Sequence, residues 1–440
     1  MDELLRAAHE AAKQAQACGA DEAKAAVVRS RGVDLEWRDG KLEKVQERTR
    51  RALSIELYVD GRYGASSTND LRPEAVGPFI ADAVAMTRLL EPDPHRALPD
   101  PARYGGRADV DLDLFDPAVN EVSSEERLAL CRDLEVMARD GAGDLPIVSV
   151  ATGVGDGFSQ SARVHTNGFE GAREGSSFSF SAMVTVKDVD GRRPMGWDFT
   201  YRRHRADLAP AERIARVARE KAAAQLGAGK LATGKYTIAV DSRAVPRLIS
   251  AFLAPLSGPS LQQRRSLWEG RLGEKVASEL LTIYDDPLLP RGLGSALWDG
   301  DGFATRRRPL VEQGVLCTYL IDDYYARKMG VEPTGADTHN FEWTLGTDDL
   351  EGLVRDVGCG VLIERFLGGN TNQTTGELSF GCAGRVIRDG KLAEPVAEVN
   401  LSGNLATLWG RLVAVGNDPN PDSSAACPSC VFEGMQLSGI

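Results

Sequence analysis

The chain has 440 residues, of which 42% are hydrophobic and 26% are charged, and its formal net charge is −12. This length and apolar content predict about two domains with full hydrophobic cores, which excludes a largely disordered protein. The acidic balance argues against nucleic acid and against an anionic membrane surface as partners, because phosphate groups are bound by basic faces.

The beginning of the sequence and its cysteines bear on the compartment. The opening stretch MDELLRAAHE is acidic and helical in pattern, and it lacks the basic and apolar regions of a signal peptide. No apolar run approaches the roughly 18 residues needed to cross a bilayer. Seven scattered cysteines, an odd number, fit a reducing compartment better than a disulfide framework. We therefore expect a cytoplasmic protein.

The first segment, residues 1–105, alternates between helix and hairpin. Apolar residues at helical spacing predict a first helix that stops near Gly19. Short strands with period-two alternation come next, and Asp39–Gly40 and Asp60–Gly61 stand where tight hairpin turns belong. A second amphipathic helix is predicted over residues 73–90. We interpret this segment as a domain of helices on an antiparallel sheet.

The middle segment, residues 106–228, continues this half with a helix, a strand cluster and another helix. Ser123 and Glu126 have the spacing of a capping box at the start of the first helix. The stretch GVGDG at 153–157 lacks the spacing of a dinucleotide-binding fingerprint, and it ends a short predicted strand. We place the boundary to the last domain after the helix over residues 209–227.

The last segment, residues 229–440, opens with a strand over 234–241 and an apolar helix over 244–256. A further helix is predicted around 272–281, and most residues from 282 onward have a β pattern. The polar, glycine-rich stretch 366–384 predicts a long loop that leads into a strand; it suits strand addition of an extended peptide or is an ordinary solvent loop. The predicted fold class is α+β, with a strongly curved or barrel-like sheet in this segment.

No local motif for a metal or nucleotide is complete. Hydrolytic zinc helices carry two histidines on one face and a glutamate base, but the five histidines are all far apart in the chain. DGDG at 299–302 imitates a calcium loop, yet Leu310 stands where that loop needs a glutamate, so we predict a turn. The stretch 321–330 reads as a helix along a sheet edge, with a site-lining role as the alternative.

Cys427 and Cys430 form a Cys-x-x-Cys pair near the end of the sequence. A structural zinc site would need a second pair, and Cys359 and Cys382 stand alone. A redox pair is expected at the start of a helix, whereas the pattern after Cys430 predicts a strand. We therefore interpret both cysteines as packing or loop residues.

Several ordered segments resemble the TldD/PmbA family, a peptidase family that includes modulators of DNA gyrase. The resemblance covers residues 20–440 and implies a soluble, two-domain subunit of a bacterial or archaeal metallopeptidase that acts on small or unfolded peptides as a dimer, typically with one subunit of each branch. The segments are VDLEWRDGKLEKVQE, RALSIELYVDGRYGASST, SARVHTNGFEG, LLPRGLGSALWDGDGFATRRRPLVEQGVLCTYLIDDYYARKMG, TGELSFGCAGRVIRDGKLAEPVAEVNLSGNLATLW and VAVGNDPN.

The two branches of that family differ in a metal motif. The TldD branch carries His-Glu-x-x-x-His on the helix after the domain-opening strand, and a cysteine near the C-terminus completes its zinc site. Here those positions fall near Ala251, Phe252 and Leu256, and Cys427 stands about where the cysteine ligand lies. Apolar side chains neither bind zinc nor act as a base. The sequence therefore resembles the PmbA (TldE) branch, which implies no catalytic or metal-binding residue and no cofactor in this chain.

The leading hypothesis is a non-catalytic subunit of a peptidase complex that supports dimer assembly and the substrate chamber. Its partners are then a TldD-like, zinc-bearing subunit or a second copy of this chain, and an extended peptide whose binding residues the sequence does not identify. The alternatives are a homodimeric peptide-binding or scaffold protein without peptidase activity, and a thiol enzyme that uses Cys427 and Cys430.

Overall fold

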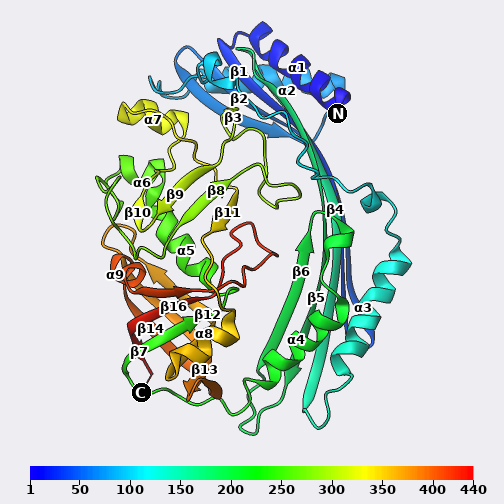
Figure 1. Cartoon of the computed structure of the whole chain (residues 1–440). Helices are drawn as coiled ribbons and strands as arrows, with labels where there is room; N and C mark the ends of the chain where they lie inside the picture. The colour runs from blue at the N-terminus through cyan, green and yellow to red at the C-terminus, as the bar shows by residue number, and fades with distance from the viewer. Residues whose placement is uncertain (440) are drawn as a thin grey trace.

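The computed structural model describes residues 1–439. The chain has two parts that lie side by side (Figure 1). The first half forms one long antiparallel sheet with helices along it, and the second half forms a barrel next to a four-stranded sheet. This combination of helices with sheets, including a barrel-like sheet in the C-terminal part, confirms the predicted α+β class.

One six-stranded sheet, in the order β3-β2-β1-β4-β5-β6, contains strands from both sides of residue 105. Four of its strands are 17–19 residues long, so the prediction of short strands is wrong. Gly32 pairs with Arg48 on one side and with Gly157 on the other. Such glycines interrupt the apolar alternation but not the backbone pairing. The strands are β1 Glu22–Arg38, β2 Lys41–Val59, β3 Arg62–Thr68, β4 Ile147–His165, β5 Glu170–Val186 and β6 Met195–Arg202.

The local signals of this half are confirmed. The residues of Asp39–Gly40 have φ of 48° and 80°, and those of Asp60–Gly61 have φ of 51° and 72°, the left-handed conformation of tight hairpin turns. The Ser123 hydroxyl accepts the Glu126 N–H at 3.1 Å, and the Glu126 carboxylate accepts the Ser123 N–H at 2.8 Å. This reciprocal capping box starts a helix where the spacing predicted one.

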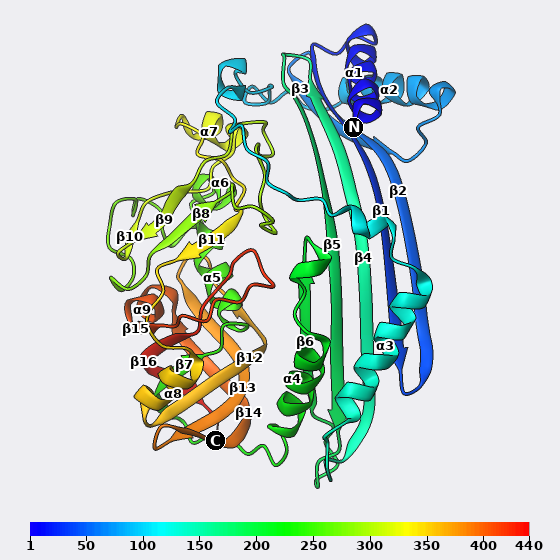
Figure 2. The same ribbon diagram turned by 45° about the vertical axis from the view of Figure 1, so that its right-hand side comes forward.

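The helices of this half pack on one face of the sheet (Figure 2). The core residues of β1 are odd-numbered throughout, from Ala23 to Val27 under one helix pair and from Val33 to Trp37 under the other. Because alternate residues face opposite sides of a strand, both cores lie on the same face. The opposite, inner face is turned toward the C-terminal part. The helices are α1 Asp2–Ala17, α2 Pro73–Thr87, η1 Pro101–Tyr104, η2 Pro117–Asn120, α3 Ser124–Arg139, η3 Arg205–Asp207 and α4 Ala211–Ala223.

Five strands of the C-terminal part close into a barrel in the order β14-β13-β12-β7-β16, with β14 pairing back to β16. The helix α5 that comes after β7 contributes Leu248 and Phe252 to the core of this part. A smaller sheet, β10-β9-β8-β11, lies next to the barrel. The strands are β7 Gly234–Val240, β8 Ile283–Asp286, β9 Arg308–Glu312, β10 Val315–Leu316, β11 Asn340–Trp343, β12 Gly360–Thr371, β13 Glu377–Arg388, β14 Lys391–Asn404, β15 Leu412–Val415 and β16 Cys430–Ser438.

Two predictions for this part are wrong. Residues 272–281 form turns rather than a helix: Gly273 has φ of 79°, and Lys275 forms a β-bridge with Val315. The stretch 366–384 is not a long loop, because β12 and β13 continue into a hairpin through solvent-exposed polar residues that give no apolar alternation. The helices are α5 Val245–Leu253, η4 Ala254–Leu256, α6 Gly258–Gln262, α7 Asp323–Met329, α8 Leu350–Val357 and α9 Leu405–Gly410.

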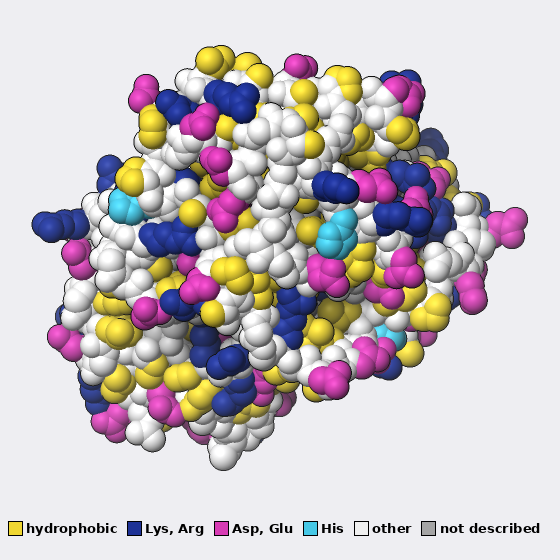
Figure 3. Space-filling model, turned by 90° about the horizontal axis from the view of Figure 1, so that it is seen from above, with side chains coloured by type: hydrophobic (Ala, Val, Ile, Leu, Met, Phe, Trp, Pro, Cys, Tyr) yellow, Lys and Arg dark blue, Asp and Glu magenta, His cyan; other side chains and the backbone are white. Residues whose placement is uncertain are grey.

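The surface carries charges of both signs. Seen from above, Lys and Arg side chains lie beside Asp and Glu (Figure 3). Arg103 and Glu332 form such a surface pair at 2.5 Å, and exposed pairs of this kind contribute little to stability. Among residues 1–439, no helix has both the length and the apolar character needed to cross a membrane.

Candidate functional site

The positions where the resemblance places the zinc motif lie on α5 and η4. Ala251 is half-buried, and the side chains of Phe252 and Leu256 are fully buried. The Phe252 ring centroid lies 5.0 Å from that of Trp268 and 5.7 Å from that of Trp409. The Trp268 indole N–H donates to the Phe252 carbonyl at 2.9 Å. These positions are therefore part of a closely packed core.

Cys427 lies near the end of the loop that connects β15 to β16, residues 416–429. This loop closes on itself, since the Ser429 hydroxyl donates to the Asp418 carboxylate at 2.7 Å. The thiols of Cys427 and Cys430 are buried and free. Burial raises the pKa of the Cys427 thiol and of the Cys430 thiol. Both cysteines are therefore neutral packing residues in the folded chain.

The residues at these positions do not fit a zinc ion. Zinc is bound by thiolates, imidazole nitrogens and carboxylates, but Ala251, Phe252 and Leu256 offer none of these and Cys427 retains its proton. Over residues 1–439, no group of three or more His, Cys, Asp or Glu side chains is arranged to hold a metal ion. The side chains at this place therefore support no metal-dependent step.

The loop 416–429 extends from the C-terminal part toward β6 (Figure 1), and Asp422 of this loop contacts that strand. The buried Asp422 carboxylate accepts the Thr200 hydroxyl of β6 at 3.0 Å and contacts the Arg202 guanidinium. Arg243 lies 3.3 Å from Asp422 and 3.1 Å from the buried carboxylate of Asp198. Buried charges need such partners, because an unpaired charge away from water is costly. We call these five residues, Asp198, Thr200, Arg202, Arg243 and Asp422, the interdomain latch.

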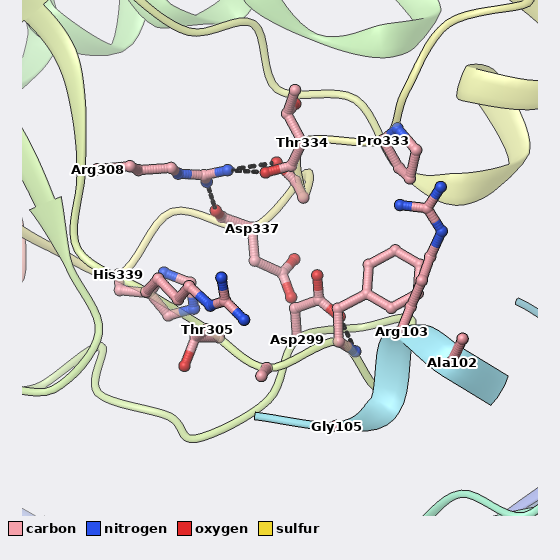
Figure 4. A pocket seen from close by; sticks show the side chains of 14 residues that line it. Ala102, Arg103, Gly105, Asp299, Thr305, Arg308, Pro333, Thr334, Asp337 and His339 are labelled. Atoms are coloured by element: carbon pink, nitrogen blue, oxygen red, sulfur yellow. Dashed lines mark hydrogen bonds between the residues drawn. The ribbon is translucent and has the colours of Figure 1, made fainter. Parts of the chain in front are cut away.

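Two cavities border the C-terminal part: the first lies against the linker at residues 102–105, and the second lies against the inner face of the long sheet. The first cavity, of about 340 Å³, is bordered by Arg103 from the linker side and by the residues shown in Figure 4. The second cavity, of about 450 Å³, lies between β4, β5 and residues 293–296. Both cavities are lined by Asp337 and His339. These two residues therefore stand between neighbouring polar spaces, which together we call the cleft.

The first cavity contains a carboxyl group with a shifted pKa. Burial, with the nearby carboxylate of Asp301, raises the pKa of Asp299 to about 6. The Asp299 side chain accepts the backbone N–H groups of Asp301 and Phe303 at 3.0 and 2.9 Å. Asp337 accepts the Gly300 N–H at 2.8 Å. A carboxyl group with such a pKa exchanges its proton close to neutral pH, which is a property of many functional sites.

Asp285 fixes the orientation of His339. The Asp285 carboxylate, which is fully buried, accepts the His339 backbone N–H at 2.6 Å and lies 3.2 Å from the ring Nδ1. Arg308 pairs with the same carboxylate at 3.2 Å and donates to the Asp337 carbonyl at 2.6 Å (Figure 4). Because a carboxylate accepts hydrogen bonds, Nδ1 is the donor in this contact.

Sequence reasoning did not single out this cleft. It predicted DGDG as a turn, and the turn is confirmed, since the Gly302 N–H donates to the Asp299 carbonyl at 3.1 Å. Asp285 and His339 are 54 residues apart, and no local pattern connects them. The only signal in the sequence was that His339 is one of just five histidines.

The helical part of the prediction for residues 321–330 is confirmed by α7. It lies against the linker between α2 and α3, where the Tyr324 hydroxyl donates to Asp93 at 2.8 Å. The Arg327 guanidinium donates to the Leu98 carbonyl of the same linker at 2.6 Å. This helix therefore anchors the linker to the C-terminal part.

Three domain models of one family match consecutive parts of the chain. Domain 1 of the PmbA/TldA metallopeptidases matches residues 23–87, the central domain matches residues 117–226 and the C-terminal domain matches residues 233–439. The chain belongs to the TldD/PmbA family. The pieces between the matches are the linkers that precede α3 and β7.

Relatives within the TldD/PmbA family match this chain along most of their length. Metalloprotease PmbA of Escherichia coli O157:H7 is 28% identical over 95% of this chain and 92% of its own. A crystal structure from Bacteroides thetaiotaomicron, described as that of a candidate modulator of DNA gyrase, is 38% identical with a TM-score of 0.97 and full coverage of both chains. TldE from Thermococcus kodakarensis shares the fold, with a TM-score of 0.88, 22% identity, and 98% and 100% coverage.

Proposed function

We propose that this chain is the metal-free, non-catalytic subunit of a TldD/PmbA-type metallopeptidase complex that hydrolyses small or unfolded peptides. In this proposal a TldD-like partner supplies the zinc ion and the general base. The observation that carries the proposal is the packing of α5 and η4, where Phe252 and Leu256 fill the core at positions that the TldD branch uses for its motif. A packed core offers neither a metal ligand nor a base.

The cysteines support the same proposal and argue against a thiol enzyme. A cysteine nucleophile or zinc ligand acts as the thiolate. Burial raises the pKa of Cys427 and Cys430, so the thiolate is disfavoured at both positions. Neither thiol is exposed to a substrate. Cys427 therefore occupies a ligand-like position in the chain without the chemistry of a ligand.

The proposed role of this chain in the complex depends on its fold rather than on catalytic side chains. Two chains with the same fold can pair about a pseudo-twofold axis, which encloses the space between them. The cleft of this chain would then form part of the substrate chamber. The interdomain latch holds the loop 416–429 against β6, so the wall of that chamber is fixed although the loop binds no metal.

Reconstitution tests the proposal. The purified chain alone should contain no stoichiometric zinc and should cleave no unfolded peptide. Addition of a TldD-like relative with the His-Glu-x-x-x-His motif should give chelator-sensitive cleavage at a rate above that of the relative alone. The matched control replaces the motif glutamate of the relative with glutamine, which should preserve the complex and abolish cleavage. Stoichiometric zinc with chelator-sensitive cleavage by the isolated chain would contradict the proposal.

The alternative is a homodimeric peptide-binding or scaffold protein without peptidase activity. Purification of the tagged chain from its native host distinguishes the peptidase-subunit hypothesis from the scaffold hypothesis. The subunit proposal expects a TldD-like chain in the complex at a one-to-one ratio, as measured by light scattering and mass spectrometry. Two copies of this chain with no such companion would favour the scaffold.

A further inference from the structure

The second cavity is lined by two arginines that form no salt bridge with the described residues. Strand register places Val28, Ser161 and Arg173 side by side on the inner face of the sheet, and all three line the cavity. Arg203 lines it from the end of β6 and donates only to the backbone carbonyls of Ser176 and Leu293, at 3.3 and 2.6 Å. Within the described residues, neither guanidinium forms a salt bridge.

A third arginine adds to this charge. The guanidinium carbons of Arg163 and Arg173 each lie 4.9 Å from the centre of the Trp298 ring. Burial lowers the pKa of Arg163, and Arg173 lowers it further. Burial also lowers the pKa of Arg203, and the charge of Arg173 acts in the same direction. Such shifts mean that cations are crowded and incompletely compensated.

The two acidic residues nearest the cavity have partners other than the arginines. Asp337 accepts the Gly300 N–H at 2.8 Å. Strand register turns the Glu174 side chain to the opposite face of the sheet, where it accepts the side-chain amide of Gln160 at 2.8 Å. The Asp337 carboxylate suits an N–H group of a peptide backbone and opposes a dianion such as phosphate. Val28 lines the same space and offers apolar contact. The wall therefore combines cationic donors, one carboxylate acceptor and apolar area.

We propose that the second cavity binds the C-terminal carboxylate of a short peptide through Arg173 and Arg203, with the hydroxyls of Ser159 and Ser161 as further donors. A guanidinium matches a carboxylate with two parallel N–H donors, and such charge-assisted bonds are among the strong ones in proteins. The volume of about 450 Å³ suits a ligand of a few residues. This site belongs to the chain itself and requires no partner.

The cavity is connected to the loop 416–429. Asn340 donates to the Ser295 hydroxyl in the cavity wall at 2.8 Å. The next residue, Phe341, donates its N–H to the Ser424 carbonyl of the loop at 2.8 Å. Residues 340–341 therefore connect the wall of the cavity to this loop through two hydrogen bonds.

Calorimetric titration of the isolated full-length chain with trialanine tests the site. The free acid should bind, and trialanine amide should bind at least about tenfold more weakly, because it lacks the charge that the guanidinium groups recognise. Arg173→Gln should weaken binding of the acid by about tenfold and leave binding of the amide unchanged. The matched control is Arg31→Gln, on the opposite face of the sheet, where Arg31 pairs with Glu47; it should change neither.

Arg173→Gln is decisive because the Arg173 side chain donates no hydrogen bond within residues 1–439, so its loss should leave the fold intact by circular dichroism. Arg203→Lys is the second variant, which keeps the charge but loses the planar fork and should weaken binding of the acid by a smaller factor. Equal binding of acid and amide, or unchanged binding by folded Arg173→Gln, would overturn the proposal. So would displacement of the peptide by an equal concentration of inorganic phosphate. A failed reconstitution of peptidase activity leaves this result untouched, because no partner is present.

Discussion

Two regions of the molecule contain the side chains that could carry chemistry, and they are built in opposite ways. Around α5, Phe252 and Cys427 lie in a closed apolar core where every group is neutral. In the cleft between the two parts, Asp299 and Arg203 have shifted pKa values because their burial is not matched by counter-charge. A site that lacks ligands can be filled by packing, whereas unmatched charge is tolerated where it faces a cavity that water or a ligand can enter.

The largest expected effect tests whether α5 is core. Phe252→Ala should lower the free energy of unfolding by about 3–5 kcal/mol, because it leaves a cavity between Trp268 and Trp409. Denaturant unfolding followed by tryptophan fluorescence measures this. The control Ala251→Ser, on the same helix, should change stability by less than about 1 kcal/mol. If Phe252→Ala left the free energy of unfolding unchanged, α5 would border an open site. The α5 region would then not differ from the cleft in being closely packed.

The interdomain latch is the link between the two regions. Asp422→Asn keeps the shape of the side chain but removes its charge beside Arg202 and Arg243. We expect a loss of about 1.5–3 kcal/mol, with faster hydrogen exchange in the loop 416–429 and in β6. Asp356→Asn, at an exposed position on α8, should cost no more than about 0.5 kcal/mol. Unchanged exchange in the loop would show that other contacts hold the two parts together.

The raised pKa of Asp299 gives the cleft a pH dependence. The folded chain binds this proton up to a pKa of about 6, whereas the unfolded chain releases it near the ordinary value of 3.8. The folded state therefore binds more protons between these values, and stability falls as the pH rises from about 4 to 6. Asp299→Asn should raise stability at neutral pH by about 1–3 kcal/mol and change it little near pH 4.

Thermal unfolding at both pH values measures this effect of Asp299→Asn. Asp82→Asn, at an exposed position on α2, is the matched control and should show no such pH-dependent difference. A loss of stability at neutral pH would instead mean that the Asp299 carboxylate is ionised and paired. The cleft would then resemble the α5 region in being fully compensated.

The smallest expected effect concerns the buried thiols. Cys427→Ala should lower the free energy of unfolding by about 1 kcal/mol and change no other property, because the thiol is a packing group. In the native chain, a thiol reagent should modify the exposed Cys359 and should reach Cys427 and Cys430 only on unfolding. If Cys427 were modified as fast as Cys359, its thiol would be accessible to solvent. A chemical role for the α5 region would then have to be considered again.

The sequence predicted features that depend on neighbours in the chain. The turn at Asp39–Gly40 arises from the ease with which these residues adopt positive φ, and the capping box arises from the spacing of Ser123 and Glu126. The predictions failed where distant contacts compete with local preference. Residues 272–281 have a helical composition, but pairing with Val315 holds them in turns.

By itself, the sequence determined that the helix after β7 has no zinc donor, because the chemistry of a side chain is set by its type. Only the tertiary structure decided that Cys427 is buried and that Asp285 orients His339 across 54 residues. The packing of the sheet against the C-terminal part also brought Arg173 and Arg203 to one cavity. Desolvation and charge crowding arise only when the two parts meet, so the charge balance of the cleft cannot be read from the order of its residues.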